Sequence, residues 1–264
     1  MSALIIFALL FALMLTGMPV SIALGLTVLS FLYFLTEVPI ESVALKLFTG
    51  IENFEIMAIP FFILAGNFLT HGGVARRMID FATSMVGHWY GGIGLAGVVA
   101  CALFAAVSGS SPATVVAIGA ILLPAMVKQG YPKQFGAGVV ATSGALGILI
   151  PPSIVMVIYS VATAGSVALG PTGERVTSAS VGQLFMAGVI PGIMLATVLG
   201  ATTFYRAWKF GYPRMERATW LQRWQAFRKS IWGLLLIVIV MGGIYAGLFT
   251  PTEAVAMSAV YAFV

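Results

Sequence analysis

Long apolar runs without a charge are the feature that most constrains how this chain can fold. Residues 3–35 contain no Asp, Glu, Lys or Arg, and as one helix they would measure roughly 50 Å, against about 30 Å for the hydrocarbon core of a bilayer. Only 8% of all residues are charged, whereas a soluble domain has about 25%. So few charges cannot cover a water-facing surface. The sequence therefore predicts an all-α membrane protein that crosses the bilayer several times.

Interruptions in the apolar runs predict where the individual helices begin and end. Thr16-Gly17-Met18-Pro19 divides the first run into two short spans joined by a turn, with one long kinked helix as the alternative. Residues 74–90 carry charges only near their start, which predicts an amphipathic helix along the membrane interface. A polar loop is expected over 170–180. The other expected spans are 56–69, 181–205, 231–249 and 251 to the end.

A basic segment sets the expected orientation. Seven of the 13 Lys and Arg residues lie between Arg206 and Lys229, with Glu216 as the acid among them, so this stretch has a net charge of +6. Cytoplasmic loops carry such an excess, and an amphipathic surface helix over 219–229 is expected to bind acidic lipid. Counting spans backward, residues 91–127 must enter and leave on the cytoplasmic side. They are therefore predicted to form a re-entrant hairpin.

The end of the chain repeats the layout of its beginning. Residues 231–264 again consist of two apolar runs separated by a short break, with Leu248–Pro251 in the place of Leu15–Pro19. The two copies are predicted to start on opposite sides of the membrane, which is the inverted repeat common in secondary transporters. Val264 ends inside a predicted span, so we expect the chain to be C-terminally truncated.

Two breaks at membrane depth carry the predicted chemistry. They are Ser108–Pro112, at the tip of the hairpin, and Gly144–Ser153. We expect Ser111 to cap the returning arm with Pro112 in its first position, leaving N–H groups that attract an anion. Carbonyl groups freed at the second break suit a small cation such as Na⁺. The alternative is that Ser, Gly and Pro only allow close packing and kinks.

The candidate residues for the ion and substrate site come from these two breaks. They are Ser108, Gly109, Ser110, Ser111, Thr114, Ser143, Gly147, Ile150, Pro151, Pro152 and Ser153. The predicted Na⁺ ligands are Ser108, Ser110, Gly147 and Ile150. No charged residue lies at the centre of a predicted span, so hydroxyls, backbone N–H groups and the cation itself would neutralise a carboxylate. The absence of a buried carboxylate favours Na⁺ over proton coupling.

The remaining reactive residues have structural interpretations. No HExxH motif occurs; His71 and His88 flank the interfacial helix as anchors, and Cys101 is expected to pack in a core. Glu253 forms a capping box with Thr250. The sequence therefore predicts neither an enzyme nor a bound cofactor. A passive channel and an ion-coupled anion transporter without a binding protein remain as alternatives to a binding-protein-dependent transporter.

Three motifs resemble one known family. They are Ser108-Gly109-Ser110-Ser111-Pro112-Ala113-Thr114, Gly147-Ile148-Leu149-Ile150-Pro151-Pro152-Ser153 and Gly247-Leu248-Phe249-Thr250-Pro251-Thr252-Glu253-Ala254. This combination resembles the large membrane subunit, DctM-like, of tripartite ATP-independent periplasmic (TRAP) transporters. The likeness runs over the whole chain.

The resemblance implies an elevator-type transporter. Its domains would be scaffold helices over 1–70, an interfacial arm helix over 71–90, half of the transport domain over 91–205, a basic cytoplasmic connector over 206–230, and the first helices of a second repeat over 231–264. The transport-domain half would hold the hairpin at 91–127, a broken helix at 135–169 and a helix at 181–205.

The resemblance also implies what is transported and with which partners. The function would be Na⁺-coupled uptake of a C4-dicarboxylate, sialic acid or similar carboxylate across the bacterial inner membrane. The implied partners are a small membrane (Q-type) subunit and a periplasmic substrate-binding protein.

Overall fold

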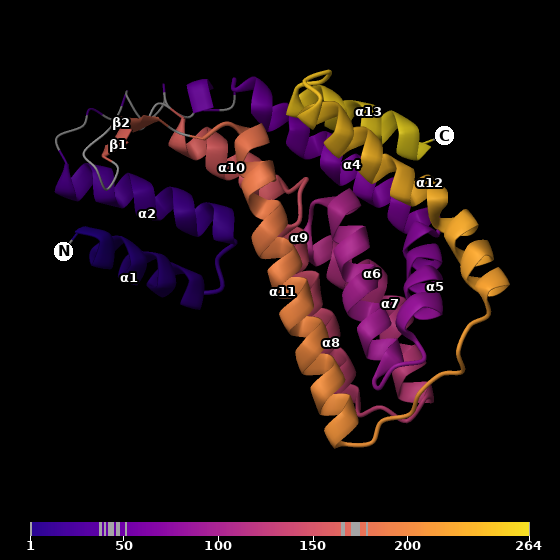
Figure 1. The fold of residues 1–264 in the computed structure, drawn as a ribbon. Coiled ribbons are helices and arrows are strands. Elements are labelled where there is room, and N and C mark those ends of the chain that lie inside the picture. Colours follow the sequence, from indigo (N-terminus) through magenta and orange to yellow (C-terminus); the bar gives the residue numbers. More distant parts are fainter. Residues whose placement is uncertain are drawn as a thin grey trace. The chain divides into compact units, whose positions relative to one another are not determined.

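The chain is helical over almost all the residues that the structure describes (Figure 1). This computed structural model describes residues 2–36, 39, 41, 45, 48–50, 52–164, 167–169, 175–177 and 179–263. The helices are α1 (Ser2–Leu15), α2 (Val20–Leu35), the 3-10 helix η1 (Phe54–Met57), α4 (Ala58–His71), α5 (Val74–Val86), α6 (Gly92–Ser108), α7 (Ser111–Lys128), α8 (Lys133–Gly144), α9 (Leu146–Leu149), α10 (Ile154–Thr163), α11 (Val181–Lys209), α12 (Trp220–Tyr245) and α13 (Pro251–Phe263). The strands are β1 (Val167–Leu169) and β2 (Arg175–Thr177).

Residues 1–53 and 54–264 form two compact units. In the first unit, α1 and α2 contact each other across the predicted turn. Gly17 has a φ of +82°, a conformation that glycine adopts without strain, and Pro19 immediately precedes α2. Two helices joined by a turn are thus confirmed, and the alternative of one long kinked helix is wrong.

The second unit is organised around α6. This helix contacts α4, α5, α7, α8, α9, α11 and α12. Small residues allow these close approaches: a Cβ atom added to Gly97 would lie 2.3 Å from Leu122 Cδ2 of α7. Cys101 and Phe104 are fully buried in the same core, which confirms the packing role predicted for Cys101.

The predicted hairpin consists of α6 and α7, and both of its ends lie against the basic segment (Figure 1). In the turn between α5 and α6, Gly87 O accepts from Met215 N over 3.1 Å. Past the end of α7, Tyr131 Oη donates to Pro213 O over 2.9 Å. Burial and then the neighbouring Tyr212 raise the pKa of Tyr131 to about 12, so this hydroxyl remains a donor at neutral pH. The hairpin shape is confirmed; its side of the membrane stays a prediction.

Helix α5 is amphipathic, as expected. Its buried residues Val74, Ala75, Met78, Ile79 and Ala82 belong to the core, and the helix contacts α6 and α12. The basic start of α12 runs along it, since Ser230 Oγ donates to Arg77 O over 2.7 Å. Protein contacts therefore cover the apolar face of α5, while its location at the membrane interface stays a prediction.

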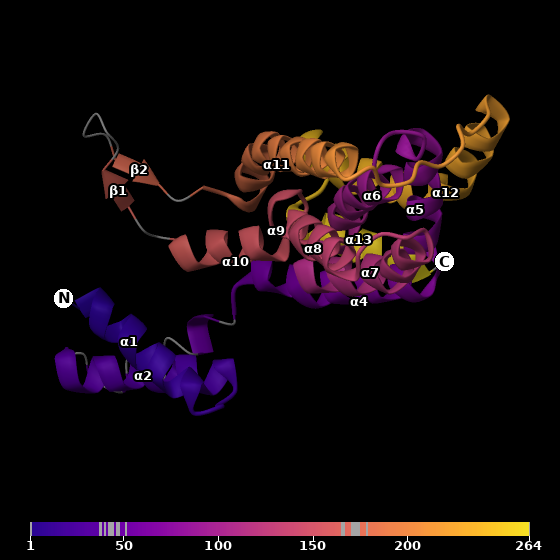
Figure 2. The same ribbon diagram turned by 90° about the horizontal axis from the view of Figure 1, so that it is seen from below.

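Several boundaries differ from those predicted. The surface helix expected over 219–229 and the span expected from 231 are one continuous helix, α12, which begins at a capping box between Thr219 and Gln222. Helix α11 extends to Lys209, and the broken helix ends at Thr163. The loop expected over 170–180 lies partly outside the described residues, but β1 and β2 pair antiparallel there, between α10 and α11 (Figure 2).

The last two helices repeat the layout of the first two. Gly247, with a φ of +70°, lies in the turn between α12 and α13, as Gly17 does between α1 and α2. Glu253 Oε2 accepts hydrogen bonds from Thr250 N and Thr250 Oγ1, both over 2.8 Å, which confirms the predicted capping box. The inverted orientation of the two helix pairs stays a prediction.

Length and composition agree with a membrane protein. Within the described residues, four helices are long and apolar enough to cross a bilayer, or five if the bent pair of 133–149 and 154–163 counts as one span. Many large apolar side chains on these helices are exposed, such as Ile190 and Val238. A lipid environment accounts for that exposure.

Candidate functional site

The hairpin turns sharply at Gly109 and Ser110. Gly109 ends α6 with a φ of +60°, and the backbone of Ser110 is extended. Ser110 Oγ accepts from Ala113 N over 3.5 Å and so caps α7. The predicted cap at Ser111 is therefore wrong by one residue: because the extended conformation ends at Ser110, Ser111 is already the first residue of α7 and Pro112 the second.

Hydroxyl groups hold the tip together from inside. Ser108 Oγ lies 3.0 Å from Thr114 Oγ1, and Thr114 Oγ1 donates to Ser110 O over 2.8 Å. Ser108 and Thr114 are both buried. These three predicted site residues form one small network, and the Ser110 carbonyl already accepts from Thr114.

Two prolines interrupt the second element. The residue before a proline is pushed away from helical geometry, and Ile150, which precedes Pro151, is extended with φ −77° and ψ 119°. Pro151 and Pro152 offer no N–H to continue the helix. Helix α10 restarts at Ile154, and its axis is bent by 43° from that of residues 133–149.

The tip and this break contact each other through their backbones. Ile154 N donates to Gly109 O over 3.1 Å, and a Cβ atom added to Gly109 would lie 2.9 Å from Pro152 O. A Cβ atom added to Gly147 would lie 2.8 Å from Ser111 N. The structure thus brings the two predicted breaks together, and it does so at positions where only glycine leaves enough room.

Two buried hydroxyls flank this contact without a partner. Ser143 Oγ and Ser153 Oγ make no hydrogen bond to any described residue, although Ser143 is only 1% exposed and Ser153 is fully buried. Ser153 directly precedes Ile154. Ser143 precedes Gly144, which packs against Val115 in the first turns of α7. An unpaired buried polar group costs about 1–3 kcal/mol, so both oxygens are suited to bind a ligand.

The structure brings together three of the four residues predicted as Na⁺ ligands, and the fourth packs elsewhere. Ser108, Ser110 and Gly147 lie together at the contact. Ile150 packs against α11, where a Cβ atom on Gly192 would lie 2.9 Å from Ile150 Cγ1. Its side chain lines an apolar groove, while the carbonyl oxygen predicted as the Na⁺ ligand at this residue stays a prediction.

A cavity of about 510 Å³ lies between α4 and the tip. Ser108, Ser110 and Pro112 line it from the tip, and Asn67 and Thr70 line it from α4. Thr70 Oγ1 donates to Gly66 O over 2.7 Å, whereas the Asn67 amide makes no hydrogen bond within the described residues. The sequence prediction missed Asn67. The available signal was an amide inside an apolar span, which is costly unless it has a function.

The charge at this site is low. Among the residues that the structure describes, no three His, Cys, Asp or Glu side chains gather as metal ligands would. The groups that meet where the tip contacts the break are hydroxyl and backbone groups.

The apolar helices, the helical hairpin and the broken helix define a polytopic membrane protein. Residues 7–264 match the family model described as "Tripartite ATP-independent periplasmic transporter, DctM component". The chain belongs to this family, which is a family of transporter components and not of enzymes.

Three relatives show how similar the chain is to known members. All three are named C4-dicarboxylate TRAP transporter large permease protein DctM. The Rhodobacter capsulatus protein is 78% identical over 263 residues, covering 100% of this chain and 60% of the relative. The Vibrio cholerae protein is 47% identical over 264 residues, covering 100% and 55%, and the Pseudomonas aeruginosa protein is 53% identical over 223 residues, covering 84% and 49%. The chain thus spans about half to three fifths of these relatives' lengths.

Replacing Gly147 with alanine tests the contact between tip and break. The added Cβ would meet the Ser110–Ser111 peptide at 2.8 Å, so G147A should lower the free energy of unfolding by about 1–3 kcal/mol. G138A is the matched control on α8, because nothing lies within 4 Å of its Cβ position. It should be neutral or stabilising. Thermal unfolding of the full-length subunit in detergent measures both, and equal midpoints for the two variants would contradict the contact.

Proposed function

We propose that this chain supplies a Na⁺ site and a substrate site to a secondary transporter that takes up an organic acid across the bacterial inner membrane. The observation that carries the proposal is the pair of buried, unpartnered hydroxyls, Ser143 and Ser153, flanking the contact between tip and break. The substrate class is a C4-dicarboxylate, since relatives up to 78% identical are named for it.

The Na⁺ ion would bind where the tip meets the break. Ser143 and Ser153 offer hydroxyl oxygens that no described group uses. Gly147 keeps the backbone of the break against Ser110 and Ser111, which brings further carbonyl oxygens near. A monovalent cation would satisfy these oxygens without a carboxylate, as at other unwound helices.

The substrate carboxylate would bind in the cavity between α4 and the tip. The N-terminus of α7, with its partial positive charge, lies at this cavity through Ser110, Pro112 and Ala113. Asn67 supplies an amide that can donate to a carboxylate. The nearby cation would add positive charge to a cavity in which His71 is the ionisable lining residue.

Transport would follow an elevator mechanism with two partners. Helices α6, α8, α9 and α11 contact one another, so they can move as one body that carries the Na⁺ site and the tip side of the substrate cavity past α4. A small Q-type membrane subunit would complete the scaffold, and a periplasmic binding protein would deliver the acid. Saturable uptake that requires the binding protein would exclude both a passive channel and a transporter that works without one.

Removing the free hydroxyls tests the Na⁺ site. In the full-length transporter with its partners, S143A and S153A should each raise the Na⁺ concentration for half-maximal uptake at least about tenfold, because each removes a ligand worth about 1.5–3 kcal/mol to a charged group. S258A is the matched control: it is also buried, but its hydroxyl donates to Val255 O over 2.6 Å within α13. Unchanged Na⁺ dependence in both test variants would disprove the assignment.

Changing Asn67 tests the substrate cavity. N67D keeps the shape of the side chain but places a negative charge beside the bound carboxylate, so it should raise the KM for the dicarboxylate at least about tenfold and more than N67A does. Q134E makes the same amide-to-carboxylate change at a position outside the cavity and should leave KM unchanged. Uptake kinetics at saturating Na⁺ measure all three, and a normal KM for N67D would rule out this location.

A further inference from the structure

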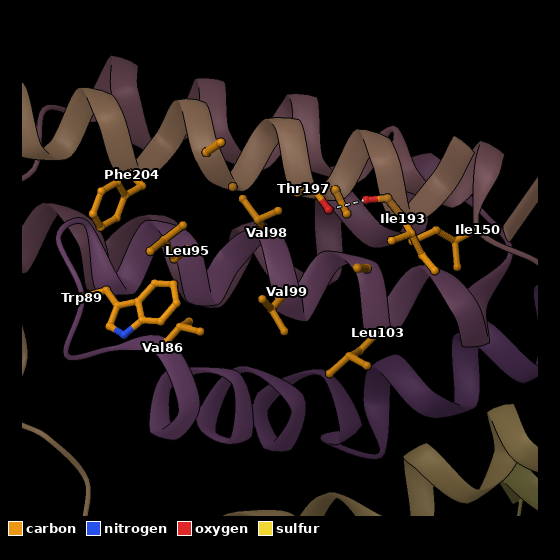
Figure 3. A pocket seen from close by; sticks show the side chains of 14 residues that line it. Val86, Trp89, Leu95, Val98, Val99, Leu103, Ile150, Ile193, Thr197 and Phe204 are labelled. Atoms are coloured by element: carbon orange, nitrogen blue, oxygen red, sulfur yellow. Dashed lines mark hydrogen bonds between the residues drawn. The ribbon is translucent and has the colours of Figure 1, made fainter. Parts of the chain in front are cut away.

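A second cavity lies between α6 and α11, away from the hydroxyl cluster (Figure 3). Its volume is about 610 Å³, within the range of ligand pockets. Side chains from α6, such as Val98 and Leu103, face side chains from α11, such as Ile193 and Phe204 (Figure 3). We call this cavity the α6–α11 groove.

The lining of the groove is apolar throughout. The hydroxyl group in it belongs to Thr197, and this hydroxyl donates to Ile193 O over 2.8 Å, so it is not free to bind a ligand. Trp89 Nε1 is likewise bonded, to His88 Nε2 over 3.0 Å. A dicarboxylate would find no donor here, whereas a hydrocarbon chain would lose no hydrogen bond on entering.

The shape of the groove follows from small residues on one helix. Ala196, Gly200 and Ala201 of α11 face the branched side chains of α6 and leave the space between them open. From Ile193 to Phe204 the groove extends roughly 16 Å along α11. Its inner end is Ile150, at the helix break, and its outer end is lined by Trp89 and Phe204.

The outer end combines aromatic rings with a cation. The rings of Trp89 and Tyr90 lie 6.4 and 6.0 Å from that of Phe204. Next to this end, Arg214 stacks on Tyr90, with its Cζ 3.2 Å from the ring centroid; Arg214 itself lines the neighbouring cavity, together with Asp80 and Glu216. Aromatic rings of this kind mark the level of lipid headgroups, and basic residues there attract anionic lipid.

We propose that the α6–α11 groove binds one acyl chain of an anionic phospholipid, whose phosphate lies at Arg214. The apolar lining selects hydrocarbon, and the guanidinium stacked on Tyr90, whose ring lies 6.0 Å from that of Phe204, selects a negative headgroup over a neutral one. The basic segment that carries Arg214, with its net charge of +6 between Arg206 and Lys229, adds to this attraction. The bound chain would fill the space between α6 and α11 up to Ile150.

The proposal is tested by lipid retention in the full-length subunit assembled with its small partner. After reconstitution in mixed phosphatidylglycerol and phosphatidylcholine, native mass spectrometry should show one retained phosphatidylglycerol. G200L fills the groove, and its Cβ fits because the nearest atom, Leu95 Cδ2, is 3.9 Å away. It should reduce retention of both lipids about tenfold, since its side chain occupies the room of about two to three methylene groups.

Matched variants separate the acyl chain from the headgroup. V198L enlarges an exposed residue of α11 outside the groove and should retain lipid normally. R214Q should abolish the preference for phosphatidylglycerol over phosphatidylcholine, whereas R217Q, in the same segment but not stacked on Tyr90, should not. Equal retention by G200L and V198L, or an unchanged preference in R214Q, would overturn the proposal.

A photo-crosslinking residue in place of Ala201 distinguishes the possible occupants directly. Crosslinks to phospholipid are the expected result. Crosslinks to the small subunit or to another part of the same chain, without a lipid product, would show that protein fills the groove and would overturn the proposal.

Discussion

The backbone contact between the hairpin tip and the helix break is the interaction on which the site depends. Each element alone interrupts a helix and leaves backbone groups that lipid could not satisfy. In contact, the break supplies a hydrogen-bond donor to the tip, since Ile154 N donates to Gly109 O. Glycine at positions 109 and 147 allows this approach, because a side chain at either would press on the opposing backbone.

The sequence predicted both elements, and its errors concerned where individual helices begin and end. Ser, Gly and Pro marked both breaks, and the uneven charge predicted that the hairpin returns to its starting side. The cap was placed on Ser111 because neighbouring serines offer the same hydroxyl; the conformations of Gly109 and Ser110 decide between them. Helix α12 was divided because its composition changes near Ser230, although the helix itself continues through that change.

Contacts between distant segments could not be predicted from local patterns. Asn67 lies far from the tip in sequence, and only the packing of α4 brings it to the cavity beside Ser110. The same holds for Ile150 and Gly147, which are close in sequence but face different surroundings. One break therefore contributes to a polar contact through Gly147 and to an apolar groove through Ile150, which keeps the proposed solute and lipid sites separate.

The central claim is that tip and break together form a Na⁺ site, and Na⁺ binding without substrate tests it most directly. A ligand that binds only the folded state raises thermal stability as its concentration rises above its Kd. At constant ionic strength, replacing K⁺ by Na⁺ should raise the Tm of the full-length subunit, and the S143A/S153A double variant should lose that rise. An identical Tm in Na⁺ and K⁺ for the unmodified protein would contradict the account.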